Sequence, residues 1–79
     1  MSNVMDFKKL VAQYCEVSAE DMTDDMRFRE DLGFTSLGFM SFLGELEDEY
    51  DVELDQEEAA NVQTIGDAIE MMNKLMEEQ

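Results

Sequence analysis

Few residues in this chain have side chains that could do chemistry, and Ser36 stands out among them. It follows a turn that contains Gly33 and stands at the start of an apolar-periodic run. At this place a serine oxygen can accept a backbone N–H of the first helical turn, so we expect Ser36 to be a helix N-cap. The residue three positions on is Phe39, not Glu or Gln, so the capping box is incomplete. The role of Ser36 therefore has to be weighed with the rest of the chain.

The remaining residue types exclude most catalytic and metal centres. With no histidine and a single cysteine, Cys15, we expect no zinc site, no His-based catalysis and no intramolecular disulfide. The acidic stretches 21–30 and 48–58 lack the central glycine of an EF-hand loop. Weak, delocalised divalent-ion binding is an alternative to a dedicated metal site. Because a domain this small has little room for a shielded carboxylate pair, we expect a protein that is not an enzyme.

The charge balance points to protein partners. The formal net charge is −16, from 21 acidic and 5 basic residues, and no basic residue occurs between 30 and 73. Such a surface repels nucleic acid and anionic membranes and attracts basic protein surfaces. The simpler interpretation is that the acids only keep a small domain soluble.

Size and composition predict one all-α domain over residues 1–79. Hydrophobic residues make up 44% of the chain, proline is absent, and Leu, Met, Glu and Ala are plentiful. No signal peptide and no segment of membrane-spanning length is apparent. We therefore expect a cytoplasmic monomer without membrane insertion.

Apolar periodicity predicts three longer helices and a short one, a small antiparallel-type four-helix bundle. The first helix, 3–15, has Phe7, Leu10, Val11 and Tyr14 inward and Lys8 and Lys9 outward. Residues 16–31 are a long connection with local turns at Ser18 and Thr23, anchored by Val17, Met22, Met26, Phe28 and Leu32. After the second helix, 36–50, Val52 and Leu54 point inward and residues 56–61 form one or two turns with Ala59, Ala60 and Val62 as the apolar side. Thr64, with Asp67 three residues on, caps the last helix, whose apolar stripe reaches Met76.

The second predicted helix has two distinct faces. Its apolar series is expected to bury Phe39, Phe42, Leu43, Leu46 and Tyr50. At 100° per residue the opposite face carries Leu37, Met40, Ser41, Gly44, Glu47 and Asp48. Two interior glycines, Gly38 and Gly44, each cost the helix about 1 kcal/mol relative to alanine. Close approach of a partner is one explanation for Gly44.

The chain resembles the acyl carrier protein family over almost its whole length, without insertions. The resemblance rests on Asp31-Leu32-Gly33, Ser36-Leu37, Leu46-Glu47-Asp48-Glu49-Tyr50, Glu57-Glu58-Ala59 and Thr64-Ile65-Gly66-Asp67-Ala68. It implies the acyl-carrier type of four-helix bundle. It also implies that a phosphopantetheinyl transferase attaches 4′-phosphopantetheine from coenzyme A to the Ser36 hydroxyl. The group carries acyl intermediates as thioesters, in fatty-acid synthesis or in a dedicated polyketide or secondary-metabolite pathway.

The resemblance gives roles to the residues around Ser36. A phosphate at a helix start meets free N–H donors and the positive end of the helix dipole. Acids on the second helix steer basic docking patches of the transferase and of acyl-processing enzymes. We expect the partner-binding residues to be Thr35, Leu37, Met40, Ser41, Gly44, Glu47 and Asp48. The alternative is an unmodified acidic interaction module that keeps the carrier fold.

Departures from the family pattern suggest a restricted set of partners. Thr35 stands where fatty-acid carriers most often have Asp, and Gly38 and Ser41 stand where the family usually has acids. Asp55 replaces the proline often found before the short third helix. We therefore expect docking through apolar contact from Leu37 and Met40. Under this hypothesis, changing Gly38 to Asp together with Ser41 to Glu improves loading by general fatty-acid enzymes.

Overall fold

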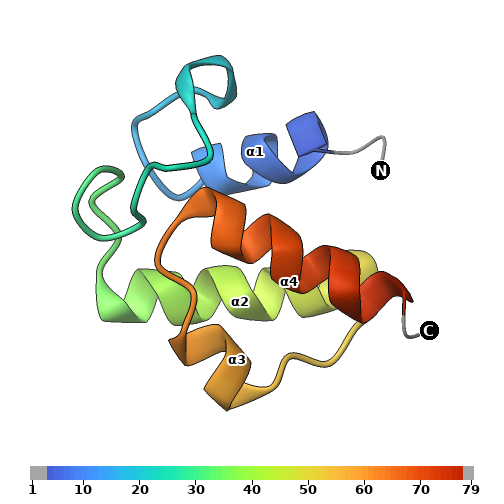
Figure 1. Ribbon diagram of the computed structural model, residues 1–79. Helices are drawn as coiled ribbons and strands as arrows, with labels where there is room; N and C mark the ends of the chain where they lie inside the picture. The colour runs from blue at the N-terminus through green and yellow to red at the C-terminus, as the bar shows by residue number, and fades with distance from the viewer. Residues whose placement is uncertain (1–3, 78–79) are drawn as a thin grey trace.

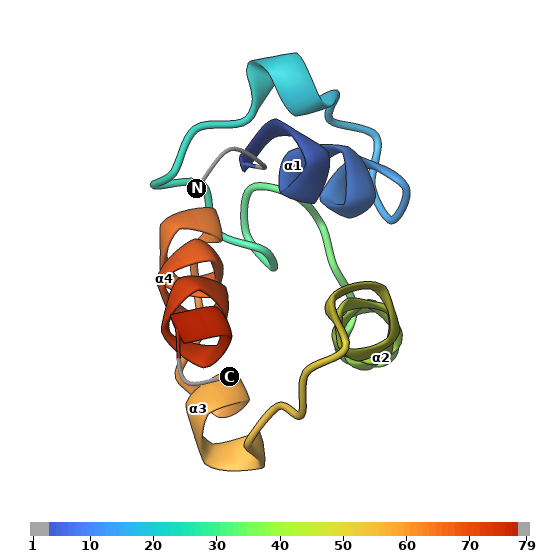
Figure 2. The same ribbon diagram turned by 90° about the vertical axis from the view of Figure 1, so that its right-hand side faces the viewer.

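The computed structural model describes residues 4–77, which form four α-helices and one 3₁₀ turn. The elements are α1 (Val4–Ala12), η1 (Ala19–Asp21), α2 (Ser36–Tyr50), α3 (Gln56–Ala60) and α4 (Ile65–Glu77). α1, α2 and α4 surround the core, with α1 running opposite to α2, and α3 lies on the side away from α1 (Figures 1 and 2). The predicted bundle of three longer helices and a short one is confirmed.

The first helix is shorter than the periodicity predicted. It buries Phe7, Leu10 and Val11 as expected but ends at Ala12, and position 3 lies outside the described residues. Beyond Ala12 the chain forms a tighter turn of the 3₁₀ type. There Gln13 and Tyr14 donate their N–H groups to the carbonyls three residues back, at 3.1 and 3.0 Å. The prediction of an outward Lys8 is wrong.

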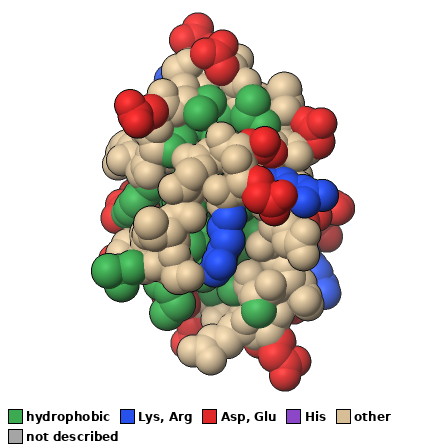
Figure 3. Space-filling model, turned by 90° about the vertical axis from the view of Figure 1, so that its left-hand side faces the viewer, with side chains coloured by type: hydrophobic (Ala, Val, Ile, Leu, Met, Phe, Trp, Pro, Cys, Tyr) green, Lys and Arg blue, Asp and Glu red, His purple; other side chains and the backbone are tan. Residues whose placement is uncertain are grey.

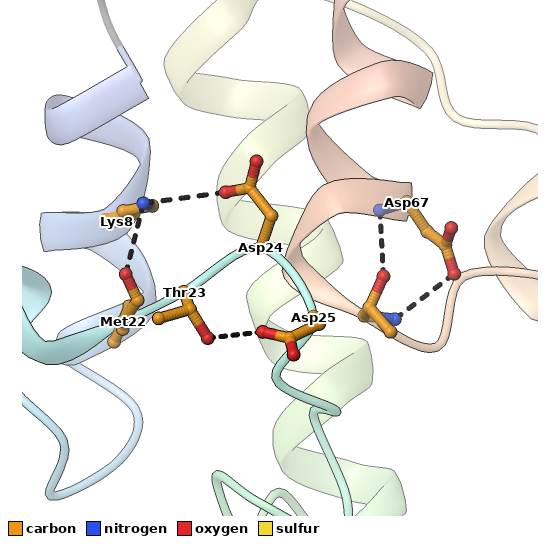
Figure 4. A network of polar contacts seen from close by, with 7 residues as sticks. Lys8, Met22, Thr23, Asp24, Asp25 and Asp67 are labelled. Atoms are coloured by element: carbon orange, nitrogen blue, oxygen red, sulfur yellow. Dashed lines mark hydrogen bonds and ion pairs between the residues drawn. The ribbon is translucent and has the colours of Figure 1, made fainter.

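Lys8 instead fastens α1 to the long connection (Figure 4). Its ammonium donates to the Met22 carbonyl at 3.2 Å and lies 3.6 Å from an Asp24 carboxylate oxygen. Only 14% of its side chain is exposed. An amphipathic lysine buries its stem while its head finds polar partners, which a helical-wheel argument does not anticipate. On the same loop Thr23 donates to Asp25, and this hydrogen bond lowers the pKa of the Asp25 carboxyl.

Removing the Lys8 ammonium should weaken this attachment. We expect Lys8→Met to lower the free energy of unfolding by about 1–2 kcal/mol, because the half-buried Met22 carbonyl loses its donor. Urea denaturation followed by circular dichroism measures the change. Lys9→Met is the matched control: the residue is exposed, the charge change is the same, and we expect a change within about 0.5 kcal/mol. Equal losses in both variants would show that charge, not the contact, is responsible.

The long connection is also tied to the start of α4 by backbone hydrogen bonds. Phe28 donates to the Gln63 carbonyl at 2.9 Å, Ile65 to Met26 at 3.0 Å, and Gly66 to Asp24 at 2.8 Å. A Cβ at Gly66 would lie 3.1 Å from the Asp24 carbonyl oxygen, so the close approach favours glycine. The predicted cap of α4 is confirmed, since Asp67 N–H donates to Thr64 Oγ1 at 3.1 Å and Thr64 N–H to the Asp67 carboxylate at 3.2 Å.

Aromatic rings dominate the core at the α1–α2 junction. Phe42 is fully buried, and its ring centroid lies 5.7–5.9 Å from those of Phe7, Tyr14, Phe28 and Phe34. Among the predicted anchors of the connection, Met22, Phe28 and Leu32 are buried, and Val17 and Met26 are half-buried. Phe34 is 6% exposed, and the periodicity argument missed it because it stands in the turn before α2.

The downstream predictions are confirmed with one exception. Val52 is buried and Leu54 is half-buried, so both point inward as expected. In α3, Ala59 is buried and Val62, just after it, is half-buried, but Ala60 is exposed. A five-residue helix presents too narrow a face to bury two consecutive alanines on one side.

Candidate functional site

Thr35, not Ser36, is the N-cap of α2, so this prediction is corrected. Thr35 has extended backbone (φ −85°, ψ 168°), and its hydroxyl accepts the Gly38 N–H at 3.0 Å. Its carbonyl accepts the Phe39 N–H at 2.9 Å. Serine and threonine are both good caps, and periodicity places a helix start only to within a residue or two. Ser36 is thereby the first helical residue, exposed, and its oxygen is not used in capping.

A closed turn places a cation beside Ser36. The chain reverses between Phe28 and Phe34, with Gly33 at φ +75°, a left-handed conformation that favours glycine. Phe34 N–H donates to the Phe28 carbonyl at 2.8 Å, and the two rings pack edge to face with centroids 5.3 Å apart. This closure brings residue 29 next to residue 36: Arg29 Nη2 donates to Ser36 Oγ at 2.9 Å.

Sequence reasoning missed Arg29. Arg29 lies in the turn before α2 and not in a helix with Ser36, so helical periodicity does not relate the two residues, and only the closure of the turn does. A signal was present, since two phenylalanines, Phe28 and Phe34, flank a short segment that contains Arg29 and the Asp-Leu-Gly turn. Figure 3 shows this end of the molecule, where basic side chains lie among tan and green atoms with acidic side chains around them.

The surroundings of Ser36 fit a phosphate ester. The backbone N–H groups of Ser36 and Leu37 belong to the first turn of α2, where no intrahelical acceptor exists. The Arg29 guanidinium already contacts the oxygen that would carry the phosphate. No acid lies in the first turn of α2 to repel an anion. The hydroxyl is exposed and accessible to a modifying enzyme.

The face of α2 beyond Ser36 is apolar and solvent-exposed. Leu37 is 78% exposed and Met40 is 65% exposed, the two most exposed large hydrophobic side chains among residues 4–77. Ser41, Gly44 and Asp48 are also exposed, as expected. Glu47 is different: it is half-buried, and its carboxylate accepts the Leu54 N–H at 2.9 Å, which secures the chain after α2.

The two α2 glycines differ in their surroundings. A Cβ at Gly38 would lie 3.1 Å from Thr35 Oγ1, so this glycine leaves room for the cap. At Gly44 a Cβ would meet no atom within 4 Å, so nothing within the described fold requires glycine there.

We accordingly expect Gly44→Ala to raise the free energy of unfolding by about 0.5–1 kcal/mol, because alanine restricts the unfolded chain and favours helix. Gly38→Ala is the comparison and should gain less, since its Cβ presses on the Thr35 hydroxyl. Chemical denaturation of both variants gives the difference. A destabilised Gly44→Ala would contradict the open surroundings of this residue.

An apolar groove runs between α2 and α3. Its α2 wall includes Phe39, Met40, Leu43 and Gly44, and its α3 side is formed by Leu54, Gln56, Ala59 and Ala60. A second hollow, lined by the 27–30 turn and Val62, shares Phe39, Ala59 and Ala60 with the groove. The two hollows together extend from Arg29 along the side of α2.

Comparison with known proteins identifies the family. A family model described as a phosphopantetheine attachment site matches residues 6–72, most of the chain. The chain belongs to the acyl carrier protein family. Acyl carrier proteins have 4′-phosphopantetheine as their prosthetic group, and so does this carrier. Members of the family are carriers on which transferases and acyl-processing enzymes act.

Solved acyl carrier structures share the fold over nearly their full length. A Mycobacterium tuberculosis protein provisionally assigned as an acyl carrier protein is 25% identical, with 92% of this chain and 97% of that chain covered and a TM-score of 0.85. The Enterococcus faecalis acyl carrier protein is 28% identical, with 91% of each chain covered and a TM-score of 0.80. The Thermotoga maritima acyl carrier protein is 30% identical, with 94% of each chain covered and a TM-score of 0.69.

Two further findings concern metals and membranes. Within residues 4–77 no group of three or more His, Cys, Asp or Glu side chains is arranged to hold a metal ion. No helix in the same range combines the length and apolarity needed to span a bilayer.

Proposed function

We propose that Ser36 is the attachment site and that the carrier holds acyl intermediates there as thioesters without catalysing a reaction itself. The observation that carries the proposal is the Ser36 hydroxyl itself: exposed, released from capping by Thr35, and contacted by Arg29 at 2.9 Å. The attached group supplies the thiol that bears the acyl chain. The match to the phosphopantetheine attachment family supports the same assignment.

In the transfer reaction this chain supplies only the nucleophilic oxygen, and the transferase supplies the base. Ser36 Oγ forms a bond to the phosphorus of coenzyme A that bears the pantetheine, and the pyrophosphate bond to that phosphorus breaks. Adenosine 3′,5′-bisphosphate leaves, and the hydroxyl proton passes to a base of the transferase. Arg29 donates to a lone pair of the hydroxyl, so the O–H remains available to such a base. The apolar groove between α2 and α3 offers shelter to an acyl chain.

We further propose that this carrier serves a dedicated pathway or a divergent fatty-acid system. The exposed Leu37 and Met40 and the absence of acids from the first turn of α2 support docking by apolar contact close to Ser36. The net charge of −16 supports steering of basic partners, with acids from Glu45 onward on α2 available to such patches. Because a side chain at position 38 would crowd the cap, Ser41→Glu alone is the cleaner test of partner range. Better loading of that variant by general fatty-acid enzymes would support restricted partner choice.

Intact-mass spectrometry tests the attachment site. The protein is incubated with coenzyme A and a broad-specificity phosphopantetheinyl transferase, with Ser36→Ala beside it. We expect a mass gain of one phosphopantetheine in the parent and none in Ser36→Ala. A gain in both proteins would place the group elsewhere. No gain in a folded parent, with a known carrier modified in the same tube, would have two interpretations: either Thr35 and the uncharged start of α2 demand a cognate transferase, or the protein is an unmodified interaction module.

A further inference from the structure

The position of Arg29 is electrostatically unusual for so acidic a protein. The ion pairs among residues 4–77 involve Lys8 with Asp24, Arg27 with Glu30, and Lys74 with Glu58. Arg29 is next to Glu30 in sequence, yet its guanidinium donates to the neutral hydroxyl of Ser36. With 21 acids and 5 bases in the chain, carboxylates are abundant as partners. Instead, the fold places this cation at Ser36 Oγ, the oxygen that would carry the phosphodiester.

The base of the Arg29 side chain is firmly fixed. The preceding residue, Phe28, is buried at 2% exposure. Its N–H donates to Gln63, and its carbonyl accepts from Phe34. Arg27 N–H donates to the Asp31 carboxylate at 2.8 Å, which closes the same turn from the other side. The turn that carries the guanidinium is therefore held by backbone hydrogen bonds and by a buried ring.

The Arg29 guanidinium has more hydrogen-bond donors than the Ser36 hydroxyl can accept. Arginine offers five N–H donors in a planar fork that matches two phosphate oxygens, whereas the Ser36 oxygen engages one of them. A phosphodiester at Ser36 adds a negative charge and two acceptor oxygens on the phosphorus bonded to Oγ. Arginine–phosphate pairs are frequently bidentate, with two parallel N–H···O bonds, which adds geometric specificity as well as energy.

We propose that Arg29 is a positioning residue that binds the phosphodiester of the attached group, an inference that rests on Ser36 being the attachment site. Arg29 also lines the hollow between the 27–30 turn and α3. By holding the phosphodiester, it directs the first part of the arm toward that hollow instead of leaving it free in solvent. This interaction forms only after loading.

The test compares loaded proteins by ³¹P NMR. Parent, Arg29→Gln, Arg29→Lys and Arg27→Gln are loaded with coenzyme A and transferase, and loading is verified by intact mass. Arg27→Gln is the matched control, because it removes the same charge from the same turn while its side chain contacts Glu30 and not Ser36. We expect parent and Arg27→Gln to share one ³¹P shift and relaxation rate. In Arg29→Gln the shift moves and relaxation reports a freer phosphodiester, with Arg29→Lys between the two.

The outcomes separate this inference from the proposed function. Identical ³¹P shifts and relaxation rates in loaded parent and Arg29→Gln would overturn the role of Arg29 and leave the attachment site intact. Failure of every phosphopantetheinyl transferase tried to give a mass gain in the folded parent would overturn both. If Arg29→Gln loads too slowly, Arg29→Lys supplies the comparison with the parent. Added salt should move the parent signal toward that of Arg29→Gln, because the guanidinium is exposed.

Discussion

Phe42→Ala is expected to lower the free energy of unfolding by about 3–5 kcal/mol. Phe42 is fully buried and packs against the rings of Phe7, Tyr14, Phe28 and Phe34. Truncating a buried phenylalanine to alanine costs about 3–5 kcal/mol. A domain of 79 residues has a total stability of only about 4–12 kcal/mol. The loss therefore removes a large share of the stability, and it unfolds a substantial part of the population if the domain lies near the lower end of this range.

Thermal and urea denaturation, followed by far-ultraviolet circular dichroism, measures this effect. Phe42→Leu is the control, since it keeps an apolar side chain in the same space and should cost clearly less than alanine. A loss below about 1 kcal/mol for Phe42→Ala would contradict the central place of this ring in the core. The same change also tests the site, because Phe28 and Phe34 support the turn that carries Arg29.

Leu37→Gln is expected to lower kcat/KM for loading at Ser36 by about tenfold or more without changing the fold. Leu37 follows Ser36 directly and is 78% exposed, so its polar replacement should change stability by no more than about 0.5 kcal/mol. Burying a leucine side chain against a partner contributes about 1.5–3 kcal/mol, which corresponds to about a tenfold to hundredfold change in rate or affinity. Leu37→Gln combined with Met40→Gln should give a larger loss than either alone.

Met5→Gln provides the matched control for this prediction. Met5 is 45% exposed on α1, away from the α2 face, so its replacement should leave loading unchanged. Loading is measured by intact mass over time at limiting transferase. Equal rates for parent and Leu37→Gln would show that the apolar residues beside Ser36 do not contact the transferase. The docking hypothesis would then have to rest on the acids later in α2.

The amino-acid sequence by itself determined the helices and the family of this protein. Apolar spacing within one helix depends on a fixed rotation per residue, so most of the inward face of each of α1, α2 and α4 was predictable. Of the five α2 residues expected to be buried, Phe42 and Leu46 are buried, whereas Phe39, Leu43 and Tyr50 are half-buried. The same holds for the Thr64–Asp67 cap, whose partners are three residues apart. The residues from Asp31 to Leu37 led to the acyl carrier family and to Ser36.

Only the tertiary structure decided how the proposed attachment site is built. The contact between Arg29 and Ser36 depends on a seven-residue chain reversal, and the burial of Lys8 depends on where the long connection passes over α1. Neither follows from local periodicity, because each joins separate segments through backbone hydrogen bonds and ring packing. The sequence also could not decide between Thr35 and Ser36 as the N-cap, because both hydroxyls suit that position. That choice leaves the Ser36 oxygen exposed, uncapped and beside a cation.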